Sequence, residues 1–301
     1  MKKIDVAIIG GGVAGMTAAI YARRANKTVV VYEKNIAGGQ ITETFAVENW
    51  PGEISISGLE LGEKVAKQAE ALGAKFNYEE VLSVAKSDNE DIIITTDEGE
   101  YFAKSLIIAT GAKERKLGLP GEEEFTGRGI SYCATCDGAF YKGKEVAVVG
   151  GGNTALNDAL YLADIASKVY LVHRRNEFRG DAILVERLRA RENVEFVLES
   201  TPVEFLGDQK LTGLKVAGKD GTERTLDVSG VFMAVGQTPQ TEIFKDLVKL
   251  DEKGYIVASE DCRTSEAGIY VAGDCRTKDV RQLVTAASDG AIAATEACKD
   301  L

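Results

Sequence analysis

Two stretches of the chain, 140 residues apart, share one pattern of apolar and polar positions. Residues 6–33 and residues 146–173 each run from an apolar strand through a glycine-rich turn and an amphipathic helix into a second apolar strand. This switch from strand to helical periodicity is typical of a β-strand, α-helix, β-strand unit. Because the pattern occurs twice without a gap, it predicts two such units more strongly than either copy would alone.

Both glycine-rich turns have the spacing found in dinucleotide-binding proteins. Their small residues are Gly10, Gly12 and Gly15 in the first copy, and Gly150, Gly152 and Ala155 in the second. The first glycine makes the tight turn, the second lets the backbone approach a pyrophosphate, and the third small residue lets helix pack on strand. The N–H groups of the following helix, which starts near Asn153 and Thr154 in the second copy, would face the phosphates. The alternative is that the second copy is a duplicate that binds nothing.

The two copies differ at the end of the second strand. The first copy has Glu33, a carboxylate that accepts hydrogen bonds from ribose hydroxyls and repels a 2′-phosphate. The second has His173, Arg174 and Arg175, with Arg179 close behind. Arginines supply charge and forked donors for a phosphate, so we expect FAD in the first unit and NADPH in the second. A solvated basic edge on an acidic protein is the alternative for the arginines.

The remaining pattern extends each unit into an α/β domain. Short β-rich runs within residues 76–103 lead to an apolar strand near residue 108, and a second β-rich stretch leads to a similar strand at residues 231–236. The sequence therefore predicts two Rossmann-like domains of three-layer ββα type, with the second inserted in the first. The expected boundaries are 1–116 and 243–301 for the FAD-binding domain, and 117–242 for the NADPH-binding domain that carries a Cys pair.

Further candidate FAD contacts lie at strand ends and in one loop. Residues 268–276 form an apolar strand that ends in Gly-Asp, and residues 281–298 follow as a helix whose N-terminus would stabilise negative charge on a reduced flavin. The loop at residues 36–52 would line the flavin, unless it is an ordinary surface connection. The candidates from these segments are Gly38, Gly39, Gln40, Asn49, Thr110, Gly111, Asp274, Arg281, Gln282 and Leu283.

Composition narrows the function classes. The net charge of −11 argues against nucleic acid as a partner, because phosphate binding needs basic patches. No apolar run approaches membrane-spanning length, and the apolar start of the chain is broken by Asp5 and ends in glycines rather than a cleavage site. We therefore expect a cytoplasmic protein with no membrane partner.

Two of the five cysteines form a C-x-x-C motif, Cys133 and Cys136. A zinc site would need two more ligands, and chance structural cysteines are a second alternative. The third is a dithiol/disulfide couple, since such pairs often have lowered thiol pKa values. The adjacent Asp137 favours the couple because a carboxylic acid can protonate a leaving thiolate. Cys262, Cys275 and Cys298 have no such context and are expected to be packing residues.

With these motifs in hand, the chain resembles the low-molecular-weight bacterial thioredoxin reductases from about residue 4 to about residue 298. The resemblance rests on GGGVAG at 10–15, GGQ at 38–40, ENWPG at 48–52, ATGA at 109–112, CATCDG at 133–138, GGGNTA at 150–155, HRRNEFR at 173–179 and AGD at 272–274. It implies that Cys136 is the flavin-proximal sulfur, that Cys133 exchanges with the partner and that Asp137 is the acid–base. It also implies a homodimer whose partner is thioredoxin or a related small redoxin.

Two other functions stay open at this point. Some similar proteins take electrons from ferredoxin, or oxidise small dithiols with oxygen, and leave the NADPH site idle. The arginines of the second unit favour NADPH. A flavin-bound redox-sensing module, in which the Cys pair is a switch without turnover, is the alternative from outside the enzymes.

Overall fold

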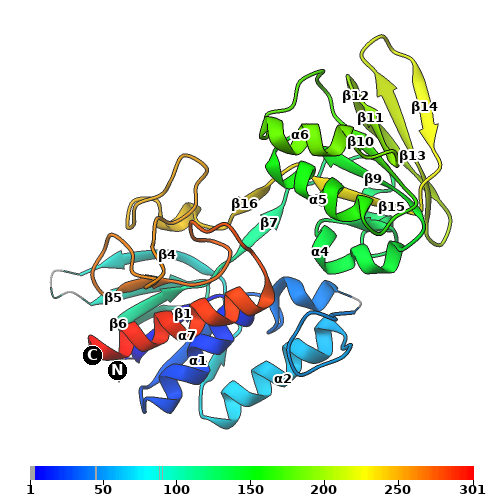
Figure 1. The fold of residues 1–301 in the computed structure, drawn as a ribbon. Helices are drawn as coiled ribbons and strands as arrows, with labels where there is room; N and C mark the ends of the chain where they lie inside the picture. The colour runs from blue at the N-terminus through cyan, green and yellow to red at the C-terminus, as the bar shows by residue number, and fades with distance from the viewer. Residues whose placement is uncertain (1–3, 45, 88, 90) are drawn as a thin grey trace. The chain divides into compact units, whose positions relative to one another are not determined.

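The computed structural model of the chain describes residues 4–44, 46–87, 89 and 91–301. The chain forms two compact units (Figure 1). Unit 1 extends to Lys113 and resumes over Thr238–Leu301, whereas unit 2 is the continuous segment Glu114–Gln237. The second unit is therefore inserted in the first. That FAD belongs to unit 1 and NADPH to unit 2 stays a prediction.

Unit 1 is built on a seven-stranded sheet with the order β3-β2-β1-β6-β5-β4, in which β17 also pairs with β6. Its strands are β1 (Ile4–Ile9), β2 (Val29–Tyr32), β3 (Lys75–Asn77), β4 (Val81–Lys86), β5 (Ile92–Thr96), β6 (Glu100–Ile108) and β17 (Ile269–Val271). Strand β5 is antiparallel to both β4 and β6, and the other pairs are parallel. The β-rich run expected at residues 76–103 is thus a meander that continues the parallel sheet.

Helices α1 and α7 of unit 1 pack against each other beside the parallel part of the sheet (Figure 1). The helical elements are α1 (Val13–Arg24), η1 (Gly39–Glu43), α2 (Gly58–Ala71), η3 (Glu242–Phe244) and α7 (Leu283–Lys299). Small residues bring α1 and α7 together, because a Cβ on Gly290 would lie 2.2 Å from the carbonyl oxygen of Ala14. Strand β17 at the chain's C-terminal end joins β6, so both ends of the chain build one core.

Unit 2 has a five-stranded parallel sheet with the order β11-β10-β9-β15-β8. Its strands are β8 (Ile130–Ser131), β9 (Glu145–Gly150), β10 (Lys168–Val172), β11 (Val194–Val197) and β15 (Gly230–Ala234). An antiparallel sheet of β12 (Ser200–Gly207), β13 (Leu211–Gly218) and β14 (Glu223–Leu226) shares one apolar core with it. The helical elements are α3 (Glu122–Phe125), α4 (Ala134–Asp137), η2 (Gly138–Tyr141), α5 (Asn153–Ala163) and α6 (Ala182–Arg189).

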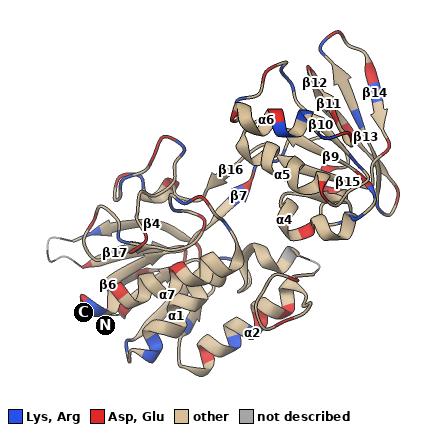
Figure 2. Ribbon diagram, viewed as in Figure 1, with Lys and Arg blue, Asp and Glu red and all other residues tan. Residues whose placement is uncertain are grey.

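Strands β7 (Ala112–Glu114) and β16 (Gln237–Pro239) pair with each other where the chain passes between the units. The predicted α/β class with two Rossmann-like units is confirmed, since each unit has parallel strands and a glycine turn that joins one of them, β1 or β9, to the next helix. Lys and Arg are interspersed with Asp and Glu over both units (Figure 2). No helix in the described part of the chain is long and apolar enough to cross a membrane.

Candidate functional site

The glycine turn of unit 1 combines close packing with open space. A Cβ on Gly10, whose φ is +108°, would lie 2.3 Å from the carbonyl oxygen of Ala109, and one on Gly15 would lie 1.9 Å from the carbonyl oxygen of Gly10. These two glycines are required by the strand–helix packing itself. At Gly12 the nearest neighbour of an added Cβ is 4.0 Å away, so the space in front of the helix N-terminus is free to take a phosphate group.

Glu33 at the end of β2 closes one side of this turn. Its carboxylate accepts hydrogen bonds from the N–H of Gly11 at 2.7 Å and from the N–H of Asn35 at 2.9 Å. Two carboxylate oxygens have about four acceptor positions, so Glu33 still has capacity for ribose hydroxyls. On the other side, the N–H of Gly38 donates to the carbonyl of Gly11 at 2.8 Å.

The remaining unit 1 candidates converge on the same turn from distant segments. Gln40 donates through its amide to the carbonyl of Ala112, which follows Gly111, and Thr110 donates to the carbonyl of Gln240 at 2.6 Å. Gly39 lies against Gly12, since an added Cβ would be 3.1 Å from the Gly12 Cα. The structure therefore brings the loop after β2 and the end of β6 together around the turn.

The end of β17 and the start of α7 complete this cluster in unit 1. Asn49 donates to the side chain of Gln282 at 3.1 Å, and Gln282 caps α7 together with Thr285. The Oδ1 atom of Asp274 is buried, and the Arg281 guanidinium lies 4.3 Å over the ring of Tyr255. Leu283, the first residue of α7, packs on the small apolar cluster beside α1.

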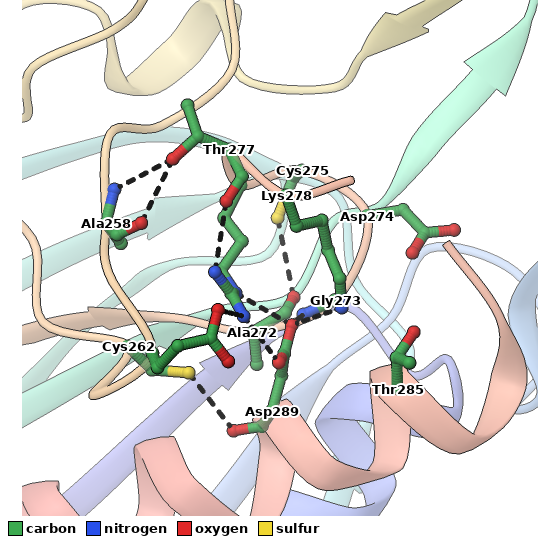
Figure 3. A network of polar contacts seen from close by, with 12 residues as sticks. Ala258, Cys262, Ala272, Gly273, Asp274, Cys275, Thr277, Lys278, Thr285 and Asp289 are labelled. Carbon is green, nitrogen blue, oxygen red and sulfur yellow. Dashed lines mark hydrogen bonds and ion pairs between the residues drawn. The ribbon is translucent and has the colours of Figure 1, made fainter. Parts of the chain in front are cut away.

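A buried ion cluster anchors the loop that carries Asp274 (Figure 3). Asp289 on α7 accepts from the N–H of Gly273 at 2.9 Å, from two guanidinium nitrogens of Arg276 at 2.9 Å each, and from Lys278 at 2.8 Å. Burial opposes the ionisation of Asp289, but the hydrogen bonds from Arg276 and Lys278 outweigh it and lower the pKa of this carboxyl. One carboxylate thus fixes three points of the loop after β17.

The turn of unit 2 repeats the arrangement of unit 1. Gly152 has nothing within 4 Å of an added Cβ, and a Cβ on Gly150 would lie 2.7 Å from the Cβ of Ala155. Asn153, the first residue of α5, accepts from the N–H of Asp181 at 2.7 Å. Thr154 follows it on the first turn of α5 and is exposed. The space in front of α5 is therefore open in the same way as the space in front of α1.

The predicted arginines line one open pocket of about 260 Å³ beside this turn. Arg174, Arg175 and Arg179 share it with Lys219 and Glu199, which approach from the antiparallel sheet. Lys219 lies 3.8 Å from Glu199 as an exposed pair. Four cations against few carboxylates make this pocket suited to a phosphate.

His173 has a different environment from the arginines that follow it. Its ring is only 6% exposed, stacks on Phe178 with centroids 5.1 Å apart, and is not among the residues that line the pocket. Burial lowers the pKa of His173, and the three neighbouring arginines add to this effect. These surroundings favour the neutral form of the His173 imidazole, and a part for it in holding a phosphate stays a prediction.

Cys133 and Cys136 are joined by a disulfide at the start of α4, with their Cα atoms 5.3 Å apart. The short helix forms because Asp137 N–H donates to the carbonyl of Cys133. Both cysteines are half-buried. A couple of this kind can be reduced to a dithiol and reformed, which is the chemistry expected from the motif.

Asp137 lies at the end of the helix that carries the disulfide. Burial raises the pKa of its carboxyl, and a 2.6 Å hydrogen bond from the hydroxyl of Ser131 acts in the opposite direction. A raised pKa is the condition under which a carboxylic acid can hold a proton for a thiolate near neutral pH. Ser131 ends β8 and is itself buried.

The surroundings of the other three cysteines, which are free thiols, disfavour the thiolate form. Cys262 and Cys275 are fully buried, and burial raises their pKa values to about 12 and about 11 respectively. Burial also raises the pKa of Cys298. A thiol held protonated is a poor nucleophile, so the structure supports the predicted packing role.

Sequence reasoning missed Ser131, the pair Lys219 and Glu199, and the Asp289 cluster. Ser131 lies two residues before Cys133, and that proximity was the only available signal for it. Nothing local marks Lys219 or Asp289, because each acts on residues far from it along the chain. In the described residues, no group of three or more His, Cys, Asp or Glu could hold a metal ion.

Comparison with known proteins gives one consistent result. The family model for pyridine nucleotide-disulphide oxidoreductase matches residues 4–291. The chain is 46% identical over 300 residues to a thioredoxin reductase of Listeria monocytogenes, covering 99% of this chain and 94% of that protein. It is 43% identical over 295 residues to a thioredoxin reductase of Bacillus subtilis, covering 97% and 93%. The crystal structure of thioredoxin reductase from Streptococcus pyogenes is similar, with a TM-score of 0.93 at 42% identity over 98% of this chain and 97% of that one.

Proposed function

Because this chain belongs to the pyridine nucleotide-disulphide oxidoreductase family, we propose that it is an NADPH-dependent reductase of the thioredoxin disulfide. The disulfide between Cys133 and Cys136 carries the proposal, because it lies next to a half-buried carboxylic acid in a unit that also has a nucleotide turn. The thioredoxin reductases of Listeria monocytogenes and Bacillus subtilis support the choice of substrate.

The residues of unit 1 fit the adenosine and pyrophosphate parts of FAD. The open space at Gly12 suits the pyrophosphate, and Glu33 suits a ribose. The candidates around the turn are Gly38, Gly39, Gln40, Asn49, Thr110, Gly111, Asp274, Arg281, Gln282 and Leu283. When bound, a flavin supplies a two-electron carrier between a nicotinamide and a disulfide.

The pocket of unit 2 fits the 2′-phosphate of NADPH. Arg174, Arg175 and Arg179 offer forked donors, and Lys219 adds a point charge. The pyrophosphate would lie on the N-terminus of α5, where Gly152 leaves space. This arrangement supports NADPH over NADH and disfavours the alternatives in which the second nucleotide site is idle.

The Cys pair would pass reducing equivalents on by thiol–disulfide exchange. After the disulfide takes up two electrons and two protons, the thiolate of Cys133 attacks one sulfur of the redoxin disulfide, and one redoxin thiolate leaves. The thiolate of Cys136 then attacks the sulfur of Cys133, which restores the Cys133–Cys136 disulfide and releases the second redoxin thiolate. Asp137 supplies a proton to a leaving thiolate and recovers one from a thiol.

The redoxin partner, the homodimer and the cytoplasmic location belong to the same proposal. The relatives named thioredoxin reductase support the partner. The homodimer follows from the resemblance to the low-molecular-weight enzymes. A cytoplasmic location fits a chain with sparse cysteines, only two of which are disulfide-bonded.

An anaerobic titration of the flavin-loaded protein with NADPH tests electron entry, with NADH as the control and flavin absorbance as the signal. We expect bleaching by NADPH at low concentration. If only dithionite bleaches the flavin, the pocket of unit 2 is silent and the proposal fails. In turnover with thioredoxin, Cys136→Ser should abolish reduction, and Cys298→Ser should retain it as a matched control.

A further inference from the structure

The hydroxyl of Ser131 contacts both the carboxyl of Asp137 and the backbone of Cys133. It donates to Asp137 Oδ2 at 2.6 Å, accepts from the N–H of Cys133 at 3.1 Å, and lies 3.2 Å from the carbonyl oxygen of Cys133. Ser131 is 5% exposed, so water does not readily replace these contacts. A single buried side chain thus touches both the carboxyl and the backbone of the redox-active turn.

A hydroxyl has one proton and two acceptor positions. Ser131 can therefore donate to only one acceptor at a time, either the carboxylate of Asp137 or the carbonyl of Cys133. With Asp137 ionised, the Ser131 proton points to the carboxylate, because a hydrogen bond to a charged acceptor is the stronger one. With Asp137 protonated, the carboxyl can donate to Ser131, and the serine proton can turn to the carbonyl of Cys133. The N–H of Cys133 donates to Ser131 in both states. Every group of the set is therefore satisfied whether or not Asp137 carries its proton.

We propose that Ser131 is a positioning residue for Asp137, whose hydroxyl holds the acid in place in both protonation states by rotating its own proton. The inference rests on the proposed function, because it concerns the acid that serves the Cys pair. Ser131 acts through Asp137 and the backbone of Cys133, which are the groups that its hydroxyl contacts. During one exchange, Asp137 gives one proton to a thiolate and later regains one from a thiol, while the serine proton only changes its acceptor.

Other titratable groups lie near Asp137, and their titrations have to be distinguished from that of Asp137. Tyr141 lies on η2, and burial and the charge of Asp137 both raise the pKa of its phenol. Helix α5 packs against α4 and carries Asp158 and Tyr161. Burial raises the pKa of Asp158 to about 6, so it titrates in a range that could be mistaken for that of Asp137. Asp158→Asn is therefore a required control.

The first experiment measures the pH dependence of thioredoxin reduction by pre-reduced, flavin-loaded enzyme in a single turnover. Ser131→Ala removes the donor that stabilises ionised Asp137. The part of the pH–rate profile that reports the titration of Asp137, called the Asp137 limb, should therefore move to higher pH. The rate at neutral pH should fall about tenfold, as expected for a displaced general acid. Ser131→Thr keeps a hydroxyl and should restore both. Asp137→Asn should remove the limb, and Asp158→Asn should leave it in place.

Ser200→Ala is the matched control for loss of a buried hydroxyl. Ser200 is 9% exposed, lies in the same unit, and donates to the carbonyl of Leu198 at 2.8 Å. It should leave both limb and rate unchanged. A uniform loss of rate in Ser131→Ala with an unmoved limb would mean that Ser131 is only structural, and the inference would be overturned.

A second readout needs neither NADPH nor thioredoxin. A water-soluble phosphine reduces the Cys pair and becomes its oxide, and infrared difference spectra then report the C=O stretch of protonated Asp137, identified by its loss in Asp137→Asn. In Ser131→Ala this band should shift, because the carboxyl loses a hydrogen bond, and Ser131→Thr should return it. An unshifted band would refute the inference. Wild-type protein that shows this band but does not reduce thioredoxin would refute the proposed function instead.

Discussion

Replacement of Asp289 by Asn should destabilise unit 1 more than any surface charge change. Asp289 is 3% exposed and is the shared acceptor of Gly273, Arg276 and Lys278. Asn keeps one acceptor oxygen for four donors and takes the buried negative charge away from Arg276 and Lys278. The exposed Glu260 stays 3.4 Å from Arg276. Breaking a buried ion pair in this way costs about 3–5 kcal/mol. We expect a loss of this size in the free energy of unfolding of unit 1.

Urea unfolding of the flavin-free protein, followed by far-UV circular dichroism and by fluorescence of the lone Trp50 of unit 1, measures the loss. Glu242→Gln is the control, because Glu242 is 82% exposed in its pair with Lys245 in the same unit and should cost at most about 1 kcal/mol. Replacing the whole cluster with apolar residues (Asp289→Leu, Arg276→Met and Lys278→Met) should cost less than Asp289→Asn alone. A loss below about 1 kcal/mol for Asp289→Asn would refute the reasoning.

The same carboxylate should shape the acid stability of the protein. Because the folded pKa of Asp289 is lowered, the unfolded chain binds the proton more readily. Its contribution is therefore fully present above the ordinary Asp pKa of about 3.9 and is lost as the pH falls through the lower folded value. Unfolding midpoints measured down this acid range should fall more steeply for the wild type than for Asp289→Asn, and parallel curves would contradict this account.

Three further predictions follow from the nucleotide pocket and the core. Replacing both Arg174 and Arg175 by Ala should weaken NADPH binding by about 1.5–3 kcal/mol for each well-formed contact and leave NADH binding nearly unchanged in titration calorimetry; equal losses for both nucleotides would contradict the phosphate assignment. Tyr32→Phe should be neutral or slightly stabilising in thermal unfolding, because the buried Tyr32 hydroxyl has no hydrogen-bond partner among the described residues; a loss above about 1 kcal/mol would argue against this. Gly290→Ala should destabilise unit 1 by about 1–3 kcal/mol, because the added Cβ would lie 2.2 Å from the carbonyl oxygen of Ala14, whereas Ala291→Gly on the same helix is expected to cost about 1 kcal/mol through helix propensity.

Much of the fold could be read from local pattern. The strand, turn and helix of each unit follow from periodicity and from the steric demands at Gly10 and Gly15, which act within a few residues. Helix α2 likewise begins at a local signal, because the Ser57 side chain accepts a hydrogen bond from the N–H of Glu60 and caps its start. The expected strand at residues 268–276 is shorter than predicted, since only Ile269–Val271 pairs with β6 and the rest is the loop held by Asp289.

The candidate site also combines local and long-range features. The Cys133–Cys136 pair and the adjacent Asp137 could be predicted from the sequence because these residues are close neighbours along the chain. Whether Asp137 is buried, and that Ser131 points at it rather than at solvent, depends on how β8 and α4 pack in unit 2. No sequence spacing encodes the direction of a hydroxyl.

The sequence by itself determined the two glycine turns, the redox pair and the arginines after β10, because each is a short motif whose chemistry depends on neighbouring residues. Only the tertiary structure decided that Lys219 and Glu199 join the arginine pocket and that Asp289 holds the loop of Asp274. Such contacts join residues that are distant in the chain, and their geometry is set by the packing of whole helices and sheets. Hydrogen bonds and ion pairs depend steeply on distance and burial, so that packing decides which polar residues act together.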